Sequence, residues 1–473
     1  MPPKLALFLC FLYIVWLFAT ERKRHAKVSA ALWVPFSWML ILGSRPLSAW
    51  LGLGHQFAST GDYVEGSPFD RLIFLALIIF GLFILARRRV DWSGLFRRNW
   101  WFFVFIAYLG TSVLWSDYSF VSFKRWIKEF GNVVMVLVVL TDERPVEATK
   151  VLLARCAYLL IPLNMLLVKY YPELGRYYNP WTYQPYFGGV TTDKNMLGMT
   201  LFVFGLSQFW IWLGLRETAR ATQGKVAWYG YSLLMVMTFW LLSKSQSSTA
   251  LGCTLLGCSL LIGLRLPVVR RNANRIGAYG VAIVIVLLFL QVTFDLAGLV
   301  TKALGRDLTF TGRTQIWQAV LGEHTNPLIG TGYYSFWLGD RVERLSRKYF
   351  YHLNEAHNGY IEVYLNSGLI GLFLLGMVFV SAGRRFGKAF SGDSRYTAMQ
   401  IAFLISTLVY SVTEATFNRL NVIWFTLLLL IIEYSGVMSD RANSPALEAQ
   451  ADEESYENAE FQPYTDVRCV AAG

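Results

Sequence analysis

Charged residues and cysteines are both scarce in this sequence of 473 residues. Asp, Glu, Lys and Arg together make up 16% of the chain, whereas 55% of the residues are hydrophobic and 16% are aromatic. So little charge excludes an ordinary soluble globular protein, which needs a polar surface. Five cysteines, most of them inside apolar runs, exclude a disulfide framework and give no sign of redox or metal chemistry.

The abundant apolar residues are grouped into segments, and this grouping predicts an all-α, polytopic membrane protein. A span needs roughly 17–25 apolar residues to cross about 30 Å of hydrocarbon. We predict about 12–13 transmembrane helices, because the first, second and ninth candidates are short. The candidates lie near 5–19, 28–43, 70–86, 100–116, 126–140, 150–168, 195–213, 226–243, 249–264, 276–293, 360–380, 396–413 and 418–436.

The loops between these spans alternate in charge. Basic clusters occupy five of the loops, which places those loops in the cytoplasm under the positive-inside rule. The net charge of +12 therefore reflects membrane topology and is no reason to expect nucleic-acid binding. The basic loops are 22–27, 87–98, 216–225, 265–275 and 384–388. The opposite loops are 44–69, 117–125, 169–194, 243–248, 294–359 and 414–417.

Two regions follow from this pattern. Residues 1–436 form a multi-span membrane domain with a large outer loop at 294–359. The stretch 312–371, which begins in this loop, is the longest part of the sequence not dominated by continuous apolar residues. Such a loop is a candidate site, because the bilayer core tolerates little polar chemistry. Residues 437–473 are acidic and poor in large aliphatic residues, so we expect a disordered cytoplasmic tail.

His357 is the first candidate for chemistry. It lies about one turn before the apolar run that starts near Tyr360, and the positive end of a helix disfavours imidazolium. A neutral imidazole at that position can act as a general base near pH 7. From position alone, the alternative is a hydrogen-bonded interfacial histidine without a catalytic role.

Arginines of the same loop are candidates for binding phosphate. Arg313 begins a predicted helix, and its guanidinium offers a planar fork suited to phosphate or pyrophosphate oxygens. The alternative for Arg313 is contact with lipid headgroups. A basic stripe follows, for which a solvated or headgroup-facing helix is the favoured interpretation. The stripe consists of Arg341, Arg344, Arg347 and Lys348.

Other outer loops add further polar candidates. Lys194 and Asn195 stand where the loop 169–194 enters a span, after a double glycine that allows close backbone approach. Lys244 lies in a very short outer hairpin. Glu414 and Arg419 bracket the last outer turn and could pair with each other. Together, these side chains suit a substrate with a lipid tail, an anionic phosphate linker and a polar group outside.

Several of these motifs, taken in order, resemble the bacterial O-antigen ligase and O-antigen polymerase superfamily. The resemblance runs from about 100 to 436 and rests on GRTQIW, NPLIGTGYYSFW and HNGYIEVYLNSGLIGL. TTDKNMLG, LLSKSQSSTAL and SVTEATFNRLNVIW are more similar to the exopolysaccharide-polymerase branch than to lipopolysaccharide ligases. The resemblance implies that His357 activates or positions the acceptor hydroxyl and that Arg313 binds pyrophosphate. Asn358, which follows His357, is a further predicted contact with the substrate. Where the ligases have a further outer arginine, this chain offers Lys244 and Gln246, and lysine lacks the bidentate fork.

The resemblance also implies a GT-C-like glycosyltransferase of the bacterial inner membrane with a periplasmic active face. Its donor would be an undecaprenyl-pyrophosphate-linked oligosaccharide, with no cofactor, neither metal nor nucleotide sugar. The acceptor would be a glycan in a polymerase, or lipid A-core or a protein in a ligase. The lipid bilayer and other polysaccharide assembly and export proteins are further expected partners. A transporter or flippase of lipid-linked sugars is a weaker alternative, because most charged residues lie at span ends. A purely structural scaffold would leave the outer His, Arg and Gly-rich features unexplained.

Overall fold

A computed structural model of the chain describes residues 1–24, 28–53, 67–178, 183–218, 222–271, 313–349, 353–390 and 395–434. The predicted span 276–293, the start of the large outer loop and the predicted acidic tail lie outside these residues.

The described chain is almost entirely helical, as the sequence predicts. Each predicted span within it coincides with a helix. The helices are α1 (Pro3–Arg24), η1 (Ala30–Leu32), α2 (Trp33–Leu42), α3 (Leu47–Trp50), α5 (Pro68–Arg87), α6 (Trp92–Arg98), α7 (Trp100–Thr111), η2 (Ser112–Trp115), α8 (Ser119–Leu140), α9 (Pro145–Tyr170), α10 (Pro172–Gly175), α11 (Lys194–Thr218), α12 (Thr222–Lys244), α13 (Ser248–Gly263), α14 (Pro267–Arg271), α17 (Arg313–Leu321), α18 (Asp340–Tyr349), α19 (Gly359–Ala389), α20 (Arg395–Tyr410) and α21 (Val422–Ile431).

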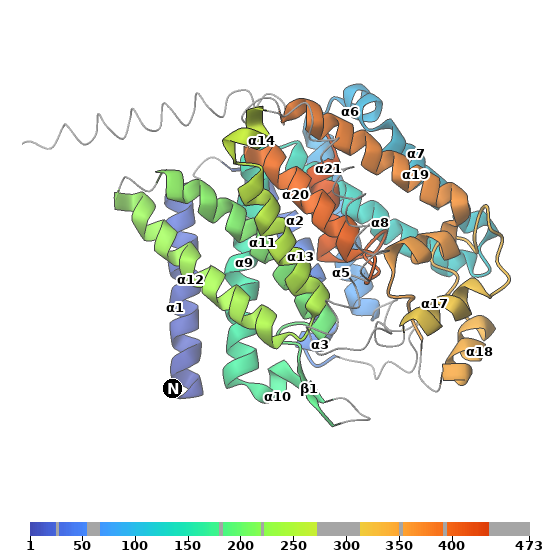
Figure 1. Ribbon diagram of the computed structural model, residues 1–473, viewed down its shortest axis with the longest axis horizontal. Helices are drawn as coiled ribbons and strands as arrows, with labels where there is room; N and C mark the ends of the chain where they lie inside the picture. Colours follow the sequence, from blue (N-terminus) through green and yellow to red (C-terminus); the bar gives the residue numbers. More distant parts are fainter. Residues whose placement is uncertain are drawn as a thin grey trace, which may run out of the picture.

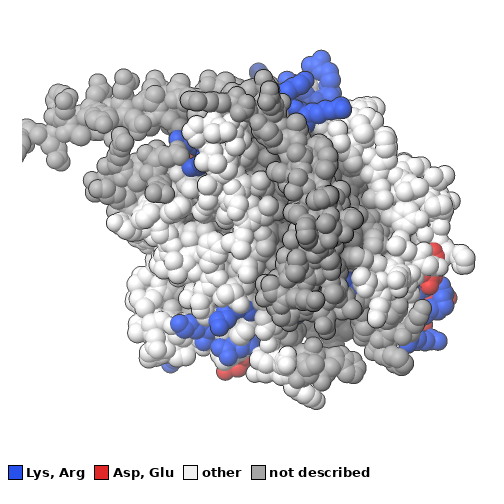
Figure 2. All heavy atoms as spheres, in the orientation of Figure 1, with Lys and Arg blue, Asp and Glu red and all other residues white. Residues whose placement is uncertain are grey.

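Five helices of the described part are long and apolar enough to cross a membrane: α1, α5, α9, α11 and α19. The shorter apolar helices include η1–α2, α7–η2, α13 and α21. The chain is therefore an all-α, polytopic membrane protein, and the count of 12–13 spans stays a prediction. Among the described residues on the face shown in Figure 2, most charged side chains lie toward the two ends of the molecule, as expected where a bilayer surrounds the middle.

The two ends of the helix bundle carry different loops. In Figure 1, α6 and α14, which belong to loops predicted to be cytoplasmic, lie at the top. The hairpin strand β1, α10, α17 and α18, which belong to loops predicted to be outside, lie toward the bottom. We call this second end the site end. The sidedness predicted from basic clusters thus agrees with the arrangement of the helices.

Two predicted boundaries are wrong. Most of the predicted loop 117–125 is helix, because α8 begins at Ser119 and its first turns carry Arg125 and Glu129, both buried. Hydropathy overlooks a helix whose charged residues face a protein interior. The last span begins at Val422, because Asn421 caps α21 by accepting a hydrogen bond from Trp424 N at 2.8 Å.

The core lies around α9, α11 and α21. All ten residues of α21 are buried, so protein surrounds this helix entirely. In contrast, α1 and α5 expose large apolar side chains such as Phe8, Phe11 and Phe80. An exposed row of this kind on a long helix suits contact with lipid.

A break in α19 receives the glycine-rich turn of the outer loop. Gly368 has φ 64° inside this helix, which leaves nearby backbone groups without helical partners. The turn supplies them: Leu369 N donates to Pro327 O at 2.9 Å, and Thr331 N donates to Leu365 O at 3.0 Å. A Cβ on Gly368 would lie 2.2 Å from the Leu328 carbonyl carbon, so glycine is required there.

The outer segments have a small hydrophobic core of their own. It joins α17, α18 and the start of α19 through buried apolar residues that include Ile316, Val320, Trp337 and Leu345. This core fixes α17 relative to the N-terminus of α19, and so fixes Arg313 relative to His357.

One element of the fold was not predicted. The strands β1 (Arg176–Tyr178) and β2 (Pro185–Phe187) form an antiparallel hairpin in which Tyr177 pairs with Tyr186. Three-residue strands are too short for an alternating pattern to stand out in a sequence.

Candidate functional site

His357 lies immediately before α19 in an uncommon backbone conformation. Its φ is 50°, in the left-handed region that few residues other than glycine adopt. The next residue, Asn358, caps α19: its Oδ1 accepts hydrogen bonds from Tyr360 N and Ile361 N, and its Nδ2 donates to Val412 O at 2.9 Å. Asn358 therefore holds the segment in place, and its predicted contact with substrate stays a prediction.

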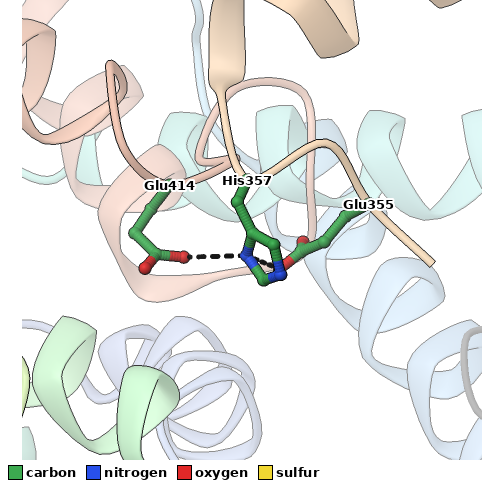
Figure 3. Close-up of side chains that lie close together, drawn as sticks. All are labelled: Glu355, His357 and Glu414. Carbon is green, nitrogen blue, oxygen red and sulfur yellow. Dashed lines mark hydrogen bonds and ion pairs between the residues drawn. The ribbon is translucent and has the colours of Figure 1, made fainter. Parts of the chain in front are cut away.

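Two carboxylates face one nitrogen of the His357 ring, as Figure 3 shows. Nδ1 lies 2.8 Å from Glu355 Oε1 and 3.5 Å from Glu414 Oε2. No described residue forms a hydrogen bond with the other ring nitrogen, Nε2. Since 28% of the side-chain surface is exposed, the imidazole can be reached from outside. The geometry therefore orients the ring through Nδ1 and leaves Nε2 for a substrate.

Arg419 binds the oxygen of Glu355 that does not face His357. Its Nη1 pairs with Glu355 Oε2, while Nη2 lies 3.3 Å from Glu362 Oε1. Glu362 in turn accepts hydrogen bonds from Trp337 Nε1 at 2.9 Å and from Ala356 N at 2.6 Å. The carboxylate beside His357 is thus fixed by a guanidinium that is itself fixed by a buried carboxylate.

Arg313 forms an ion pair with Glu414 and is largely shielded from solvent. Its Nη2 lies 2.6 Å from Glu414 Oε1, and Nη1 donates to the carbonyl oxygen of Thr413. The exposed share of the Arg313 side chain is 15%. The expected pairing of Glu414 with Arg419 is wrong, because these side chains point to different partners. Glu414 instead connects Arg313 to His357, since its two oxygens face one residue each.

The electrostatics of His357 differ from the sequence-based expectation. Burial alone lowers the pKa of the imidazole, but the hydrogen bonds and charges of Glu355 and Glu414 outweigh burial and raise the pKa from 6.5 to about 9. The expectation of a neutral imidazole is therefore wrong for this arrangement. The reason is distance: two carboxylates lie against Nδ1, whereas a helix terminus contributes only a partial charge.

Glu355 and Arg419, the next ion pair of this cluster, are charged as well. Burial raises the pKa of Glu355, but the charge of Arg419 and the hydrogen bond with His357 outweigh it and lower the pKa to about 2. The pKa of Arg419 is raised, because the nearby acidic groups outweigh its burial. These charges stabilise one another, so the cluster is preorganised.

The other predicted site residues lie around this cluster. Lys194 is exposed and Asn195 is half-buried in the first turn of α11, where Asp193 Oδ1 accepts hydrogen bonds from Asn195 N and Met196 N. Burial raises the pKa of Asp193, and the negative charges of Glu355 and Glu414 add to the rise. The start of α11 thus lies within electrostatic reach of the cluster. Lys194 forms no ion pair within the described chain.

Lys244 ends α12 and is exposed. Its hairpin meets the segment that carries Glu414, because Thr249 Oγ1 lies 2.8 Å from Thr413 Oγ1. Among the described side chains, none forms an ion pair with Lys244. The structure therefore brings together His357, Arg313 and Glu414 and places both lysines outside their contacts.

Sequence reasoning missed Glu355, Arg419 as its partner, and Asp193. Glu355 stands two residues before His357 in NEAHNGY, and an acidic residue so close to a candidate histidine was the available signal. The Arg419–Glu355 contact spans 64 positions, and no local pattern marks it.

The cluster has the ligand types of a metal site. One ligand atom each from Glu355, His357 and Glu414 lies within 4.8 Å of the others. However, Arg419 and Arg313 already neutralise the two carboxylates, and a cation there would have to displace a guanidinium and the Nδ1 proton. The donor set therefore fits an ion-pair network better than a metal centre.

Two comparisons with known proteins found similar sequences. Residues 221–376 match the model of the O-antigen ligase family, a range that includes both Arg313 and His357. The chain is also 27% identical over 327 residues to the exopolysaccharide production protein ExoQ of Rhizobium meliloti (strain 1021). That match covers 66% of this chain and 70% of the relative.

This chain is an O-antigen ligase/polymerase-like protein. The coarse function that follows is that of an enzyme of the glycosyltransferase-like ligase and polymerase kind. The resemblance found in its motifs is confirmed.

Proposed function

We propose that this enzyme polymerises undecaprenyl-pyrophosphate-linked repeat units into exopolysaccharide at the periplasmic face of the inner membrane. The observation that carries the proposal is the Glu355–His357 pair placed one ion pair away from Arg313. The pair offers a proton acceptor and the arginine offers a phosphate ligand. A polyprenyl-pyrophosphate glycan presents both a phosphate and a reacting sugar at the membrane surface.

The proposed chemistry is a single displacement. The acceptor hydroxyl oxygen bonds to the anomeric carbon of the donor, the bond from that carbon to the pyrophosphate oxygen breaks, and the carbon is inverted. His357 Nε2 takes the hydroxyl proton, and Glu355 stabilises the imidazolium that forms, as a carboxylate does in other His–carboxylate pairs. Arg313 stabilises the departing pyrophosphate, which needs charge compensation more than a proton.

The raised pKa of His357 has a consequence for this step. With a pKa of about 9, roughly one imidazole in a hundred is unprotonated at pH 7. The unprotonated form is a stronger base than ordinary imidazole, and this compensates in part for the small unprotonated fraction. The enzyme should therefore work faster as the pH rises towards 9.

The lipid-linked intermediates of a gene-deletion strain test the proposal. Single repeat units should accumulate while polymer is lost, and a plasmid copy carrying His357→Ala should fail to restore polymer at normal protein level. Full-length lipid-linked polymer that lacks its final attachment would instead identify a ligase, the activity that the family description favours. Normal polymer yield from His357→Ala would contradict the base assignment. A chelator should leave the rate of the purified enzyme unchanged, since the proposed reaction uses no metal.

A further inference from the structure

Four planar side chains form a continuous row at the site end. The guanidinium carbon of Arg45 lies 5.1 Å from the centre of the Trp50 ring and 5.5 Å from that of the Tyr177 ring. Tyr177 in turn stacks on Tyr186, with ring centres 5.5 Å apart and planes 22° from parallel. We call Trp50, Arg45, Tyr177 and Tyr186 the aromatic row.

Hydrogen bonds to the backbone fix the row in place. Arg45 Nη2 donates to Gly189 O at 2.6 Å, and Arg45 Nε donates to Thr191 O at 3.3 Å. Tyr177 Oη donates to the same Thr191 oxygen at 3.1 Å. The connection after α2 and the β1–β2 hairpin are thus tied to one segment. A surface fixed in this way loses little conformational freedom when it binds a ligand.

The row is bonded to the segment that leads to the start of α11. The segment that receives its hydrogen bonds runs directly into Asp193, the residue that caps α11. Burial raises the pKa of Tyr186, and the nearby charge of Asp193 adds to it. Burial raises the pKa of Asp193, and the charges of Glu355 and Glu414 raise it further. In Figure 1, the hairpin and α17 lie toward the same end of the helix bundle. A glycan subsite at the row therefore requires a substrate held at His357 to extend past the start of α11.

The chemistry of the row suits sugar rings. Each pyranose has a face of C–H groups, which packs on the electron-rich face of an aromatic ring. Rigid Trp, Tyr and Arg side chains also dominate many binding surfaces, because they combine apolar area with hydrogen-bond donors. The exposed share of Trp50 is 41%, so a ring face is available to a ligand.

We propose that the aromatic row is a glycan subsite that holds the distal sugars of the lipid-linked repeat unit while its first sugar reacts at His357. This inference rests on the proposed function, and it adds to it a second binding region for the oligosaccharide. Aromatic side chains at a membrane surface also contact lipid headgroups, and the experiment separates the two occupants.

The test compares two donors with the full chain in nanodiscs. One donor is the complete polyprenyl-pyrophosphate repeat unit from a polymerisation-deficient strain, and the other is its truncated form with the first sugar alone. Tyr186→Ala should raise KM about threefold to tenfold for the complete donor and leave KM for the truncated donor unchanged. Tyr186→Phe should retain the wild-type value. Tyr178→Ala is the matched control, because Tyr178 lies in the same hairpin, on β1, and is 64% exposed, but as the neighbour of Tyr177 in the strand it points to the opposite face.

Two results would overturn the subsite. One is an equal change of KM for both donors, or no change for either, while the wild-type enzyme polymerises normally. The other comes from replacing Trp50 with photo-reactive p-benzoylphenylalanine: crosslinks to phospholipid, with none to the radiolabelled donor, would identify the row as a membrane contact. Crosslinks to the glycan would support the proposal. If the wild-type enzyme itself forms no polymer, the proposed function fails, and that outcome is distinct from both.

Discussion

Replacing Glu355 with glutamine should move the pH dependence of catalysis without removing the catalytic imidazole. The rise of the His357 pKa from 6.5 to about 9 corresponds to about 3 kcal/mol of preference for the protonated form, at about 1.4 kcal/mol per pKa unit. Glu355 makes the shorter of the two carboxylate contacts, at 2.8 Å against 3.5 Å for Glu414. Glu355 therefore supplies the larger share of the rise in the His357 pKa. Glu355→Gln should lower the pKa of His357 by about 1 to 2 units.

The assay is the initial rate of dimer formation from purified lipid-linked repeat units, with the enzyme in nanodiscs at constant ionic strength. The value of kcat/KM reports the pKa of groups on the free enzyme. For the wild type, kcat/KM should rise about tenfold per pH unit and level off near pH 9, as expected for a base that works unprotonated. For Glu355→Gln, the midpoint should lie at lower pH and the plateau should be lower, since the imidazolium that forms is less stabilised.

A matched control separates this effect from a general loss of charge. Glu323 pairs with Arg344 at 3.2 Å in the outer loop and is not among the carboxylates that face His357, so Glu323→Gln should leave the midpoint unchanged. Both variants should elute at the wild-type volume and stay folded at the assay temperature before they are compared. An unchanged midpoint in Glu355→Gln would refute the role of Glu355. A wild-type rate that falls as the pH approaches 9 would show that the imidazolium is the active form.

Three further predictions follow from the same geometry. Because the pKa of His357 is raised, the stability that its protonated form contributes is complete below pH 6.5 and is lost as the pH rises to about 9. The melting temperature should therefore fall between pH 6.5 and 9, and it should vary less over this range in His357→Gln. Arg313→Lys should raise KM for the lipid-linked donor about tenfold, because lysine lacks the guanidinium fork; Arg344→Lys, on the exposed surface, should not change KM. Gly368→Ala should lower the melting temperature and the yield of folded protein, because φ is 64° there and backbone lies within 2.2 Å of the new Cβ, whereas Gly376→Ala in the same helix meets nothing within 4 Å and should be tolerated.

The sequence was informative where chemistry is local. Apolar runs located the helices, and basic clusters sorted the loops onto two ends, because both signals depend on adjacent residues meeting lipid or water. His357, Arg313 and Glu414 were singled out one at a time, and the structure brings them together. The glycine-rich turn fills the break at Gly368 through a contact between distant segments, which no local pattern marks.

The ion pairs of the site could not be predicted from the sequence, because their partners are distant along the chain. Glu414 and Arg419 are five positions apart, and proximity in sequence suggested that they pair. Each instead pairs with a residue of the outer loop, Glu414 with Arg313 and Arg419 with Glu355. The protonation state of His357 followed these pairings and could not be predicted without them, because the dominant contributions come from carboxylates whose distance to the ring is set by tertiary packing.

Glu414 connects the two halves of the proposed chemistry, and this makes its replacement informative. One oxygen lies 2.6 Å from Arg313 Nη2 and the other 3.5 Å from His357 Nδ1. A pyrophosphate that binds Arg313 has to share or displace the first oxygen. Glu414→Gln removes that competitor but also the anchor that holds the guanidinium, so KM for the donor should change. The pH midpoint should also shift, by less than in Glu355→Gln, because the contact with the ring is longer. If Glu414→Gln shifts the pH midpoint but leaves KM for the donor unchanged, Arg313 does not bind the donor. In that case Glu414 acts on His357 alone, because the loss of its contact with Arg313 has no effect on donor binding.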